Sequence, residues 1–212
     1  MSSQFIVREA KESDVEGIRS ALWEAFQPEL PRTRPLALED PAGFAAETSA
    51  RTLSTIQDTS SSCKWFVAVP VEDPTAVASA VMWERVENAN ATPFEPATSS
   101  PWGGPAQVEV HNEAVVLYRV AVEERPHYVV NVFATHPSFQ GKGAGSTLIA
   151  HLAKILDKEG MLSYLDSSPP SRRLYEKYGW KTVAQFKFPE PSTGPEDQPM
   201  YVKVMLREPG AS

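Results

Sequence analysis

The feature that most constrains the fold of this 212-residue chain is a glycine-rich loop, Gln140–Gly145, between two segments of different hydrophobic period. Residues 128–135 are mostly β-branched and aromatic, which predicts a buried strand. From Leu148 to Leu156 the apolar residues recur at helical spacing, which predicts an amphipathic helix. Glycines let main-chain N–H groups converge, and the first turn of a helix carries four unpaired donors and a partial positive charge. The loop therefore predicts a site for a phosphorylated ligand.

The spacing of the glycines separates the kinds of ligand that such a loop can hold. A P-loop requires Gly-Lys followed by Ser or Thr, and here Gly143 follows Lys142, which excludes that motif. A dinucleotide site requires GxGxxG and an acidic residue about 20 positions later, and Asp166 lies at about that distance, although the loop reads GxGxG. A third pattern, Gln-x-x-Gly-x-Gly, is filled by Gln140, Gly143 and Gly145. A loop that only caps a core helix is the alternative without a ligand.

Hydrophobic patterning predicts further elements on both sides of this loop. Strands are predicted at 5–8, 64–69, 76–85, 128–135, 162–166, 180–188 and 200–206, and helices at 13–26, 43–56, 108–125, 146–159 and 171–178. The strand–helix–strand unit around the glycine loop predicts one right-handed parallel pair, and the last two strands predict an antiparallel pair.

Residues 87–107 are rich in proline, glycine, serine and threonine, and we expect them to form a flexible insertion. Trp102 within this segment is expected to pack back onto the surface, with a cover over a substrate pocket as the alternative.

Composition narrows the classes of function. Twenty basic against 27 acidic residues give a net charge of −7, which argues against nucleic-acid binding. Cys63 is the single cysteine, so no disulfide within the chain is expected, and the histidines show no ligand spacing for a metal. No secretory signal or membrane-spanning run is visible, so we expect a cytoplasmic protein with no membrane partner. The length fits one domain, 1–212.

A second motif gives the glycine loop a specific interpretation. Leu174–Trp180 reads L-Y-x-K-x-G-W, and Phe133–Pro137 reads F-A-T-x-P directly before the loop. Together with Gln-x-x-Gly-x-Gly, these motifs closely resemble the signatures of the GNAT N-acetyltransferase superfamily in their order and spacing. The resemblance is close over 128–180 and covers 5–85 only in outline. It implies an α/β (α+β) fold, with a mixed, mostly antiparallel central sheet of six to seven strands flanked by helices.

The resemblance also implies acetyl-CoA as co-substrate, with no metal. The pyrophosphate cradle of the family corresponds to Gln140, Gly141, Lys142, Gly143, Ala144, Gly145 and Ser146. The strand that meets the pantetheine and the thioester corresponds to Phe133, Ala134 and Thr135. Ser168 stands where many members carry an asparagine that bonds pantetheine, and its shorter side chain puts that contact in question.

Two catalytic assignments follow from the same resemblance. Tyr175 matches the tyrosine beside the sulfur and is expected to be the general acid, with a purely structural ring between helix and sheet as the alternative. Where many members carry a Glu or His base on the central strand, this chain has Asn131 and Val129. We expect Asn131 to orient a water that relays the proton. By strand position, the other candidates for the base are Glu84, His127 and Asp166.

These expectations predict an N-acetyltransferase that moves the acetyl group of acetyl-CoA directly to the primary amine of a small molecule. A protein or peptide amine is the alternative acceptor. A non-catalytic CoA-binding module and a dinucleotide-binding oxidoreductase are the alternative functions. The acceptor is expected between the connection after Phe26 and the loop 189–199, whose Glu190, Glu196 and Asp197 would attract a cation. The sequence leaves the oligomeric state open.

Overall fold

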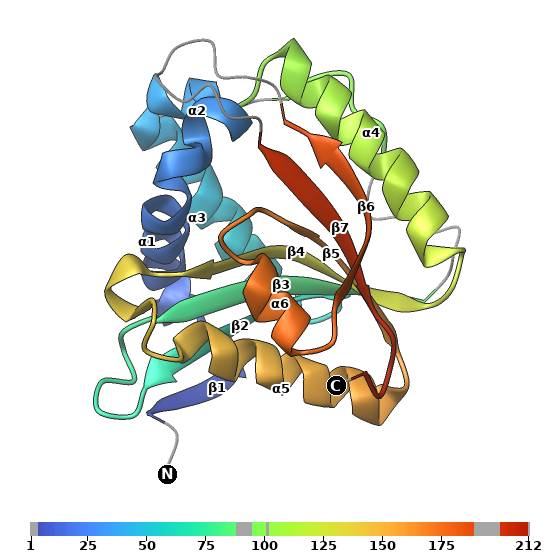
Figure 1. The fold of residues 1–212 in the computed structure, drawn as a ribbon. Coiled ribbons are helices and arrows are strands. Elements are labelled where there is room, and N and C mark those ends of the chain that lie inside the picture. Colours follow the sequence, from blue (N-terminus) through green and yellow to red (C-terminus); the bar gives the residue numbers. More distant parts are fainter. Residues whose placement is uncertain (1–3, 88–94, 101, 189–199, 212) are drawn as a thin grey trace.

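Among the residues that the computed structural model describes (4–87, 95–100, 102–188 and 200–211), seven strands form one sheet in the order β1-β2-β3-β4-β5-β7-β6 (Figure 1). The strands are β1 (Phe5–Glu9), β2 (Cys63–Pro70), β3 (Ser79–Val86), β4 (His127–Thr135), β5 (Leu162–Ser167), β6 (Lys181–Lys187) and β7 (Tyr201–Arg207). β4 and β5 are parallel, and the other neighbouring pairs are antiparallel. The expected mixed, mostly antiparallel sheet is confirmed. A dinucleotide-binding fold needs a mostly parallel sheet, so that alternative is excluded.

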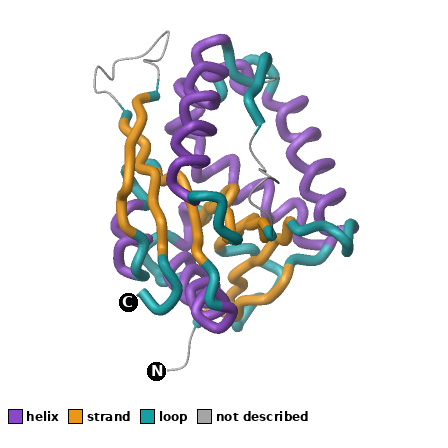
Figure 2. The backbone as a smooth tube through the Cα atoms, turned by 90° about the vertical axis from the view of Figure 1, so that its right-hand side faces the viewer, coloured by secondary structure: helices purple, strands orange, loops and turns teal. Residues whose placement is uncertain are grey.

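Helices cover both faces of this sheet (Figure 2). They are α1 (Val15–Phe26), α2 (Leu30–Thr33), α3 (Pro41–Gln57), α4 (Pro105–Val122), α5 (Ala144–Glu159) and α6 (Arg172–Lys177), with 3-10 turns η1 (Glu12–Asp14), η2 (Gln27–Glu29), η3 (Pro35–Leu38) and η4 (Pro137–Phe139).

Strand alternation assigns the helices to their faces, because successive side chains point to opposite sides. Val81 and Leu165 pack with the buried side chains of α5 and α6. Their neighbours Ala80 and Tyr164 point the other way, and pack with α1 and α4 respectively. One face therefore belongs to α5 and α6. The opposite face is shared by α1 and α3 over one half of the sheet and by α4 over the other half.

Several element boundaries differ by a few residues from the sequence-based expectation, and two of the differences have a local cause. α4 begins at Pro105, because proline suits the first turn of a helix and the preceding residue, Gly104, is extended. The strand expected from Ala76 begins only at Ser79, because Asp73 holds a turn in which its Oδ1 accepts from the N–H and hydroxyl of Thr75.

Candidate active site

A bulge in β4 separates this strand from β5. Val132 lies opposite Met82 and Val130 lies opposite Trp83, so Asn131 between them has no partner on β3. The pairing of β4 with β5 runs from His127 to Val130 and ends there. The two parallel strands therefore diverge at Asn131, which leaves the rest of β4 with one edge unpaired by β5.

The main chain of β4 beyond the bulge offers polar groups along this edge. The N–H of His136 donates to the carbonyl of Ala78 at 3.0 Å on β3's side, and strand amides alternate in direction. The main-chain groups of Phe133 and Thr135 therefore face away from β3, and the Thr135 carbonyl accepts from Gln140 Nε2 at 3.0 Å. The carbonyl of Ala134 is turned to β3, where Ser79 Oγ donates to it at 2.7 Å.

The glycine loop leads directly from this edge into the N-terminus of α5. Gly141 (φ 73°) and Gly143 (φ 94°) have left-handed backbone conformations, which favour glycine. A Cβ at either position would meet nothing within 4 Å, so the space beside the loop is open. Gly143 is the N-cap residue and has no side chain with which to satisfy the first-turn donors. The first-turn N–H groups of Ala144, Gly145 and Ser146 are therefore available to an anion.

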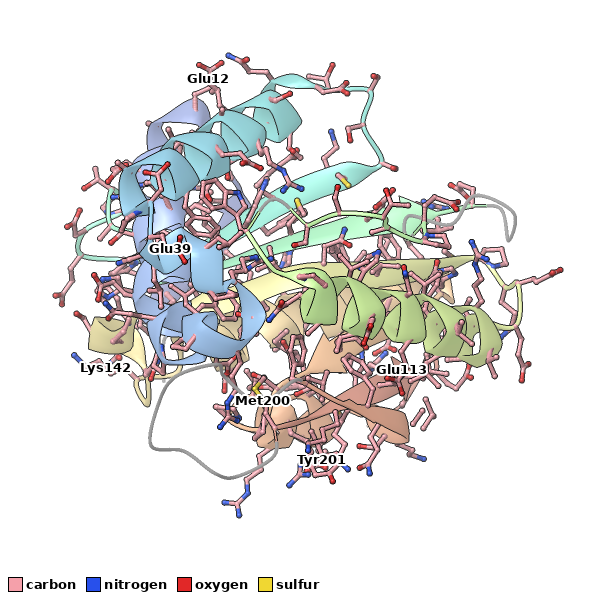
Figure 3. The ribbon with its side chains drawn as sticks, turned by 90° about the horizontal axis from the view of Figure 1, so that it is seen from above. Glu12, Glu39, Glu113, Lys142, Met200 and Tyr201 are labelled. Carbon is pink, nitrogen blue, oxygen red and sulfur yellow. The ribbon has the colours of Figure 1, made fainter. Side chains whose placement is uncertain are left out.

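Gly145 is required for a different reason. A Cβ at this position would lie 2.8 Å from Thr135 Oγ1 and 3.1 Å from Phe133 Cζ, so glycine allows α5 to approach β4 closely. Ala144 and Gly145 are buried, whereas Gln140 and Lys142 are exposed. Figure 3 shows Lys142 at the edge of the molecule, away from Glu113 of α4. The exposed cation and the free N–H donors together favour a negatively charged ligand at this end of α5.

Tyr175 lies beneath the same edge of the sheet. Its side chain is 3% exposed, and its ring meets those of Phe133 at 5.9 Å and Trp180 at 6.0 Å in edge-on contacts. Burial raises the pKa of Tyr175 well above its ordinary value, and a hydrogen bond with Ser171 acts against this rise. Like an ordinary tyrosine, the phenol is protonated at neutral pH and can donate a proton or a hydrogen bond.

Ser168 follows β5 and connects to a carboxylate that sequence reasoning missed. Burial raises the pKa of Glu29, on η2, and a hydrogen bond from Ser168 partly offsets the rise. The Ser168 carbonyl accepts from the hydroxyl of Ser171 at 3.2 Å. A signal for Glu29 in the sequence is weak, because it is one acidic residue in the proline-rich connection after α1.

A cavity of ≈ 580 Å³ opens on the face of the sheet covered by α1 and α3. Its floor comes from β2, β3 and β4, and its walls come from α1, α2, α3 and residues near the start of α4. The floor includes Glu84 and Asn131, and Asn131 Nδ2 donates to Glu84 Oε2 at 3.4 Å. The residue at which β4 leaves β5 therefore also lines the cavity.

Trp102 lines this cavity and is half-buried, so it does not pack on the outer surface as expected. Its Nε1 donates to Glu47 Oε2 at 2.7 Å, and its ring lies edge-on to that of Phe44 at 5.2 Å. The N–H of Leu36 donates to the Trp102 carbonyl at 3.1 Å, which ties the segment to η3. The segment also joins α4 through Asn112, whose side chain bonds both main-chain groups of Ala97. Residues 88–94 and 101 of the expected insertion lie outside the described residues.

The remaining candidates for a base have structural partners. His127 is buried beneath α4, where its Nε2 lies 2.6 Å from the Tyr118 hydroxyl and its Nδ1 lies 2.6 Å from the Arg125 carbonyl. Burial lowers the pKa of His127. Asp166 accepts from the Tyr164 hydroxyl at 2.7 Å; its side chain keeps accessible surface, but surrounding protein atoms raise its pKa to about 7. Neither residue lines the cavity.

Three further expectations concern the acidic residues of 189–199, metal binding and membrane spans. Glu190, Glu196 and Asp197, expected to attract a cation, lie outside the described residues. Within the described part of the chain, no three His, Cys, Asp or Glu side chains gather in a way that could hold a metal ion. In that same part, no helix is long and apolar enough to cross a membrane.

Comparisons with known proteins agree with this geometry. The sequence model of the acetyltransferase (GNAT) family matches residues 16–180. The apo form of an agmatine N-acetyltransferase variant is similar in structure, with a TM-score of 0.70, 17% identity and coverage of 97% of this chain and 100% of that one. No curated protein sequence matches the chain.

Two further solved structures show the range of acceptors among similar folds. The polyamine N-acetyltransferase of Drosophila melanogaster has a TM-score of 0.68 at 16% identity, over 96% of this chain and 99% of that one. The ribosomal-protein-S18-alanine N-acetyltransferase of Escherichia coli has a TM-score of 0.54 at 12% identity, over 98% and 96%. At such identities these likenesses show a common fold.

Proposed function

The chain belongs to the acetyltransferase (GNAT) family, whose members use acetyl-CoA as co-substrate, and from that premise we propose that it transfers the acetyl group directly to the primary amine of a small molecule. The observation that carries this proposal is the position of the cavity. Its floor contains Asn131, the residue at which β4 and β5 diverge. A volume of ≈ 580 Å³ is within the usual range for small-molecule sites.

The residues present fit acetyl-CoA. The first-turn N–H groups of Ala144, Gly145 and Ser146 would hold the pyrophosphate, with Gly141 and Gly143 leaving space for it and the side chains of Gln140 and Lys142 beside it. The main-chain groups of Phe133 and Thr135 at the open edge of β4 would hold the pantetheine arm, and Ser168 directly follows β5, the strand that faces this edge. Acetyl-CoA supplies an acyl group activated as a thioester. The open space beside Gly141 and Gly143 is the observation that supports this fit.

An acceptor amine must lose a proton before it can attack, since its pKa is about 10 in water. In this proposal, Asn131 orients a water at the cavity floor. Glu29, which lies on η2 beside Ser168 and outside the lining of the cavity, accepts the proton through that water. Burial raises the pKa of Glu29, which makes its carboxylate a stronger base than an exposed one. Glu84, bonded to Asn131, is the competing acceptor.

Tyr175 is proposed as the general acid. Its phenol is protonated at neutral pH, and its contact with Phe133 places it beside the open edge of β4. It would donate a proton to the departing sulfur. The structural alternative is a ring that only fills the space between α6 and the sheet.

Release of free CoA thiol tests the function. The protein is mixed with acetyl-CoA and a panel of monoamines, diamines, amino acids and a lysine-containing peptide. Amine-dependent thiol release with small members of the panel is expected. Release with the peptide alone would assign a protein or peptide acceptor. Binding of acetyl-CoA without release on any amine would instead indicate a non-catalytic CoA-binding module.

A further inference from the structure

Three arginines line the cavity, and they differ in their partners. Arg19 is bound by Glu16, whose carboxylate accepts from its Nε at 2.8 Å and from its Nη2. Arg51 is 78% exposed and lies 3.9 Å from Glu47. Among the described residues, no carboxylate forms an ion pair with Arg34. Arg34 is therefore the cavity cation whose charge is left without an ion-pair partner in the described part of the chain.

The surroundings of Arg34 favour binding of an anion. Its side chain is exposed, and because the residue lines the cavity, this surface is open to a ligand. Surrounding protein atoms desolvate the guanidinium and lower its pKa, the like charge of Arg51 lowers it further, and Glu47 acts in the opposite direction. An anion beside Arg34 would offset the like charge of Arg51 and would give Arg34 the ion-pair partner that it lacks among the described residues.

An aromatic wall adjoins this cation. The Arg34 Cζ lies 6.0 Å from the centroid of the Phe44 ring. Phe44 in turn contacts Trp23 at 6.0 Å and Trp102 at 5.2 Å. These three rings all line the cavity, and they favour an apolar or aromatic body in the ligand.

The floor of the cavity has the opposite charge. Glu84 and Asn131 lie there, beside the point at which β4 and β5 diverge. An ammonium group is attracted to Glu84, and this end is also where acetyl transfer is proposed. The cavity thus has a cationic group on its α2 side, at Arg34, and a carboxylate on its β3 floor.

We propose that the acceptor is an amine that also carries an oxyanion, which pairs with Arg34 while the amine lies beside Glu84 and Asn131. A carboxylate is the best match, because the planar guanidinium presents two parallel N–H donors to it. This inference rests on the proposed acetyltransferase function. It predicts that agmatine and polyamines are poor acceptors for this chain, because the second cation of such a molecule would face both Arg34 and Arg51.

Matched acceptor pairs test the proposal through kcat/KM for thiol release: tyramine against tyrosine, and putrescine against 4-aminobutyrate, with 3-aminopropylphosphonate to separate carboxylate from phosphonate. In the unaltered protein the acid-bearing member of each pair is expected to be preferred on the order of 10- to 100-fold, the usual range for a hydrogen-bonded charge. Arg34→Gln should remove this preference, mainly through KM for the acceptor. Arg34→Glu should reverse it in favour of putrescine. Arg119→Gln removes an exposed arginine of α4 that is paired with Glu95, and it should leave the preference between the members of each pair unchanged.

Equal use of the two members by the unaltered protein, or an equal loss for both in Arg34→Gln, would overturn the proposal. If no member is turned over, titration with tyrosine and 4-aminobutyrate is followed by the tryptophan fluorescence of the protein, excited at a wavelength that tyrosine does not absorb; Trp23, Trp65 and Trp102 line the cavity. Binding that Arg34→Glu abolishes would support the proposal, and absence of binding would overturn it. Acetyl-CoA binding is measured separately for each variant, so loss of the coenzyme site is distinguished from loss of the anion site.

Discussion

Asn131 Nδ2 lies 3.4 Å from Glu84 Oε2, and Asn131 is also the bulge residue at which β4 leaves its pairing with β5. The bulge therefore sets two things at once: the open edge along which an extended ligand can bind, and the direction of an amide into the cavity. Conversion of Asn131 to Ala should lower kcat on the order of tenfold and alter its pH profile, because the relay water loses its partner. Steady-state kinetics across pH would check this. An unchanged kcat with an unchanged pH profile would remove Asn131 from the mechanism.

The proposed base predicts a pH dependence with a definite sign. Burial raises the pKa of Glu29, and only its ionised form accepts a proton, so kcat should rise with pH through that raised pKa. Glu29→Gln should remove this rise of kcat with pH and lower kcat by about 10²-fold. Glu84→Gln is the matched control and should keep the rise. If Glu84→Gln removes the rise while Glu29→Gln retains it, the base is Glu84.

Tyr175→Phe separates the acid from the structural role. The phenylalanine ring preserves the contacts with Phe133 and Trp180, so the unfolding temperature should change little. Loss of the hydroxyl should lower kcat by about 10²-fold, with KM for acetyl-CoA unchanged, because the proton is needed only in the transition state. A full rate in this variant would assign Tyr175 to packing alone.

The C-terminal end of the chain is held by a buried cation. Arg207 is 2% exposed, and its guanidinium donates to both oxygens of Asp157 at 2.7 and 3.0 Å and to the Tyr178 carbonyl at 2.7 Å. These bonds hold the pKa of Asp157 below its ordinary value, against a smaller opposite effect of burial. Asp157→Asn should lower the free energy of unfolding by about 1–2 kcal/mol at pH 7, less than for a fully buried pair because the Asp157 side chain is 41% exposed.

The sign of the pH effect on this pair follows from the lowered pKa. The stabilisation is fully present above the unfolded pKa of about 3.9 and is lost as pH falls through the folded value. Urea titrations of the unaltered protein and of Asp157→Asn should therefore show a difference in the free energy of unfolding that is smaller at pH 3 than at pH 7. Glu87→Gln, which breaks the exposed pair with Arg85, is the control and should have little effect. A difference that is constant across pH would show that the loss comes from packing.

The sequence predicted the elements and the glycine loop before α5 because these depend on local patterns. Glycines with positive φ at 141 and 143 and the apolar stripe of α5 are readable from adjacent residues. The acceptor side was not readable in this way. Contacts such as Trp102 with Glu47 and Glu29 with Ser168 join segments far apart in the chain, and they leave no periodic signal. The anion-binding role proposed for Arg34 likewise depends on its contact with Phe44, which only the tertiary structure reveals.

Calorimetric titration of acetyl-CoA into the protein tests the central claim, that the N-terminal end of α5 binds the pyrophosphate. The unaltered protein should release or absorb heat with a saturable one-site curve. Gly143→Asp should abolish the signal, since it adds a negative charge beside the first-turn donors. Gly160→Asn is the control: it places a side chain on a residue with a left-handed backbone conformation (φ 66°) at the opposite end of the same helix. This variant leaves the glycine loop unaltered and should bind acetyl-CoA normally. No heat with the unaltered protein, or equal heat with Gly143→Asp, would contradict the account.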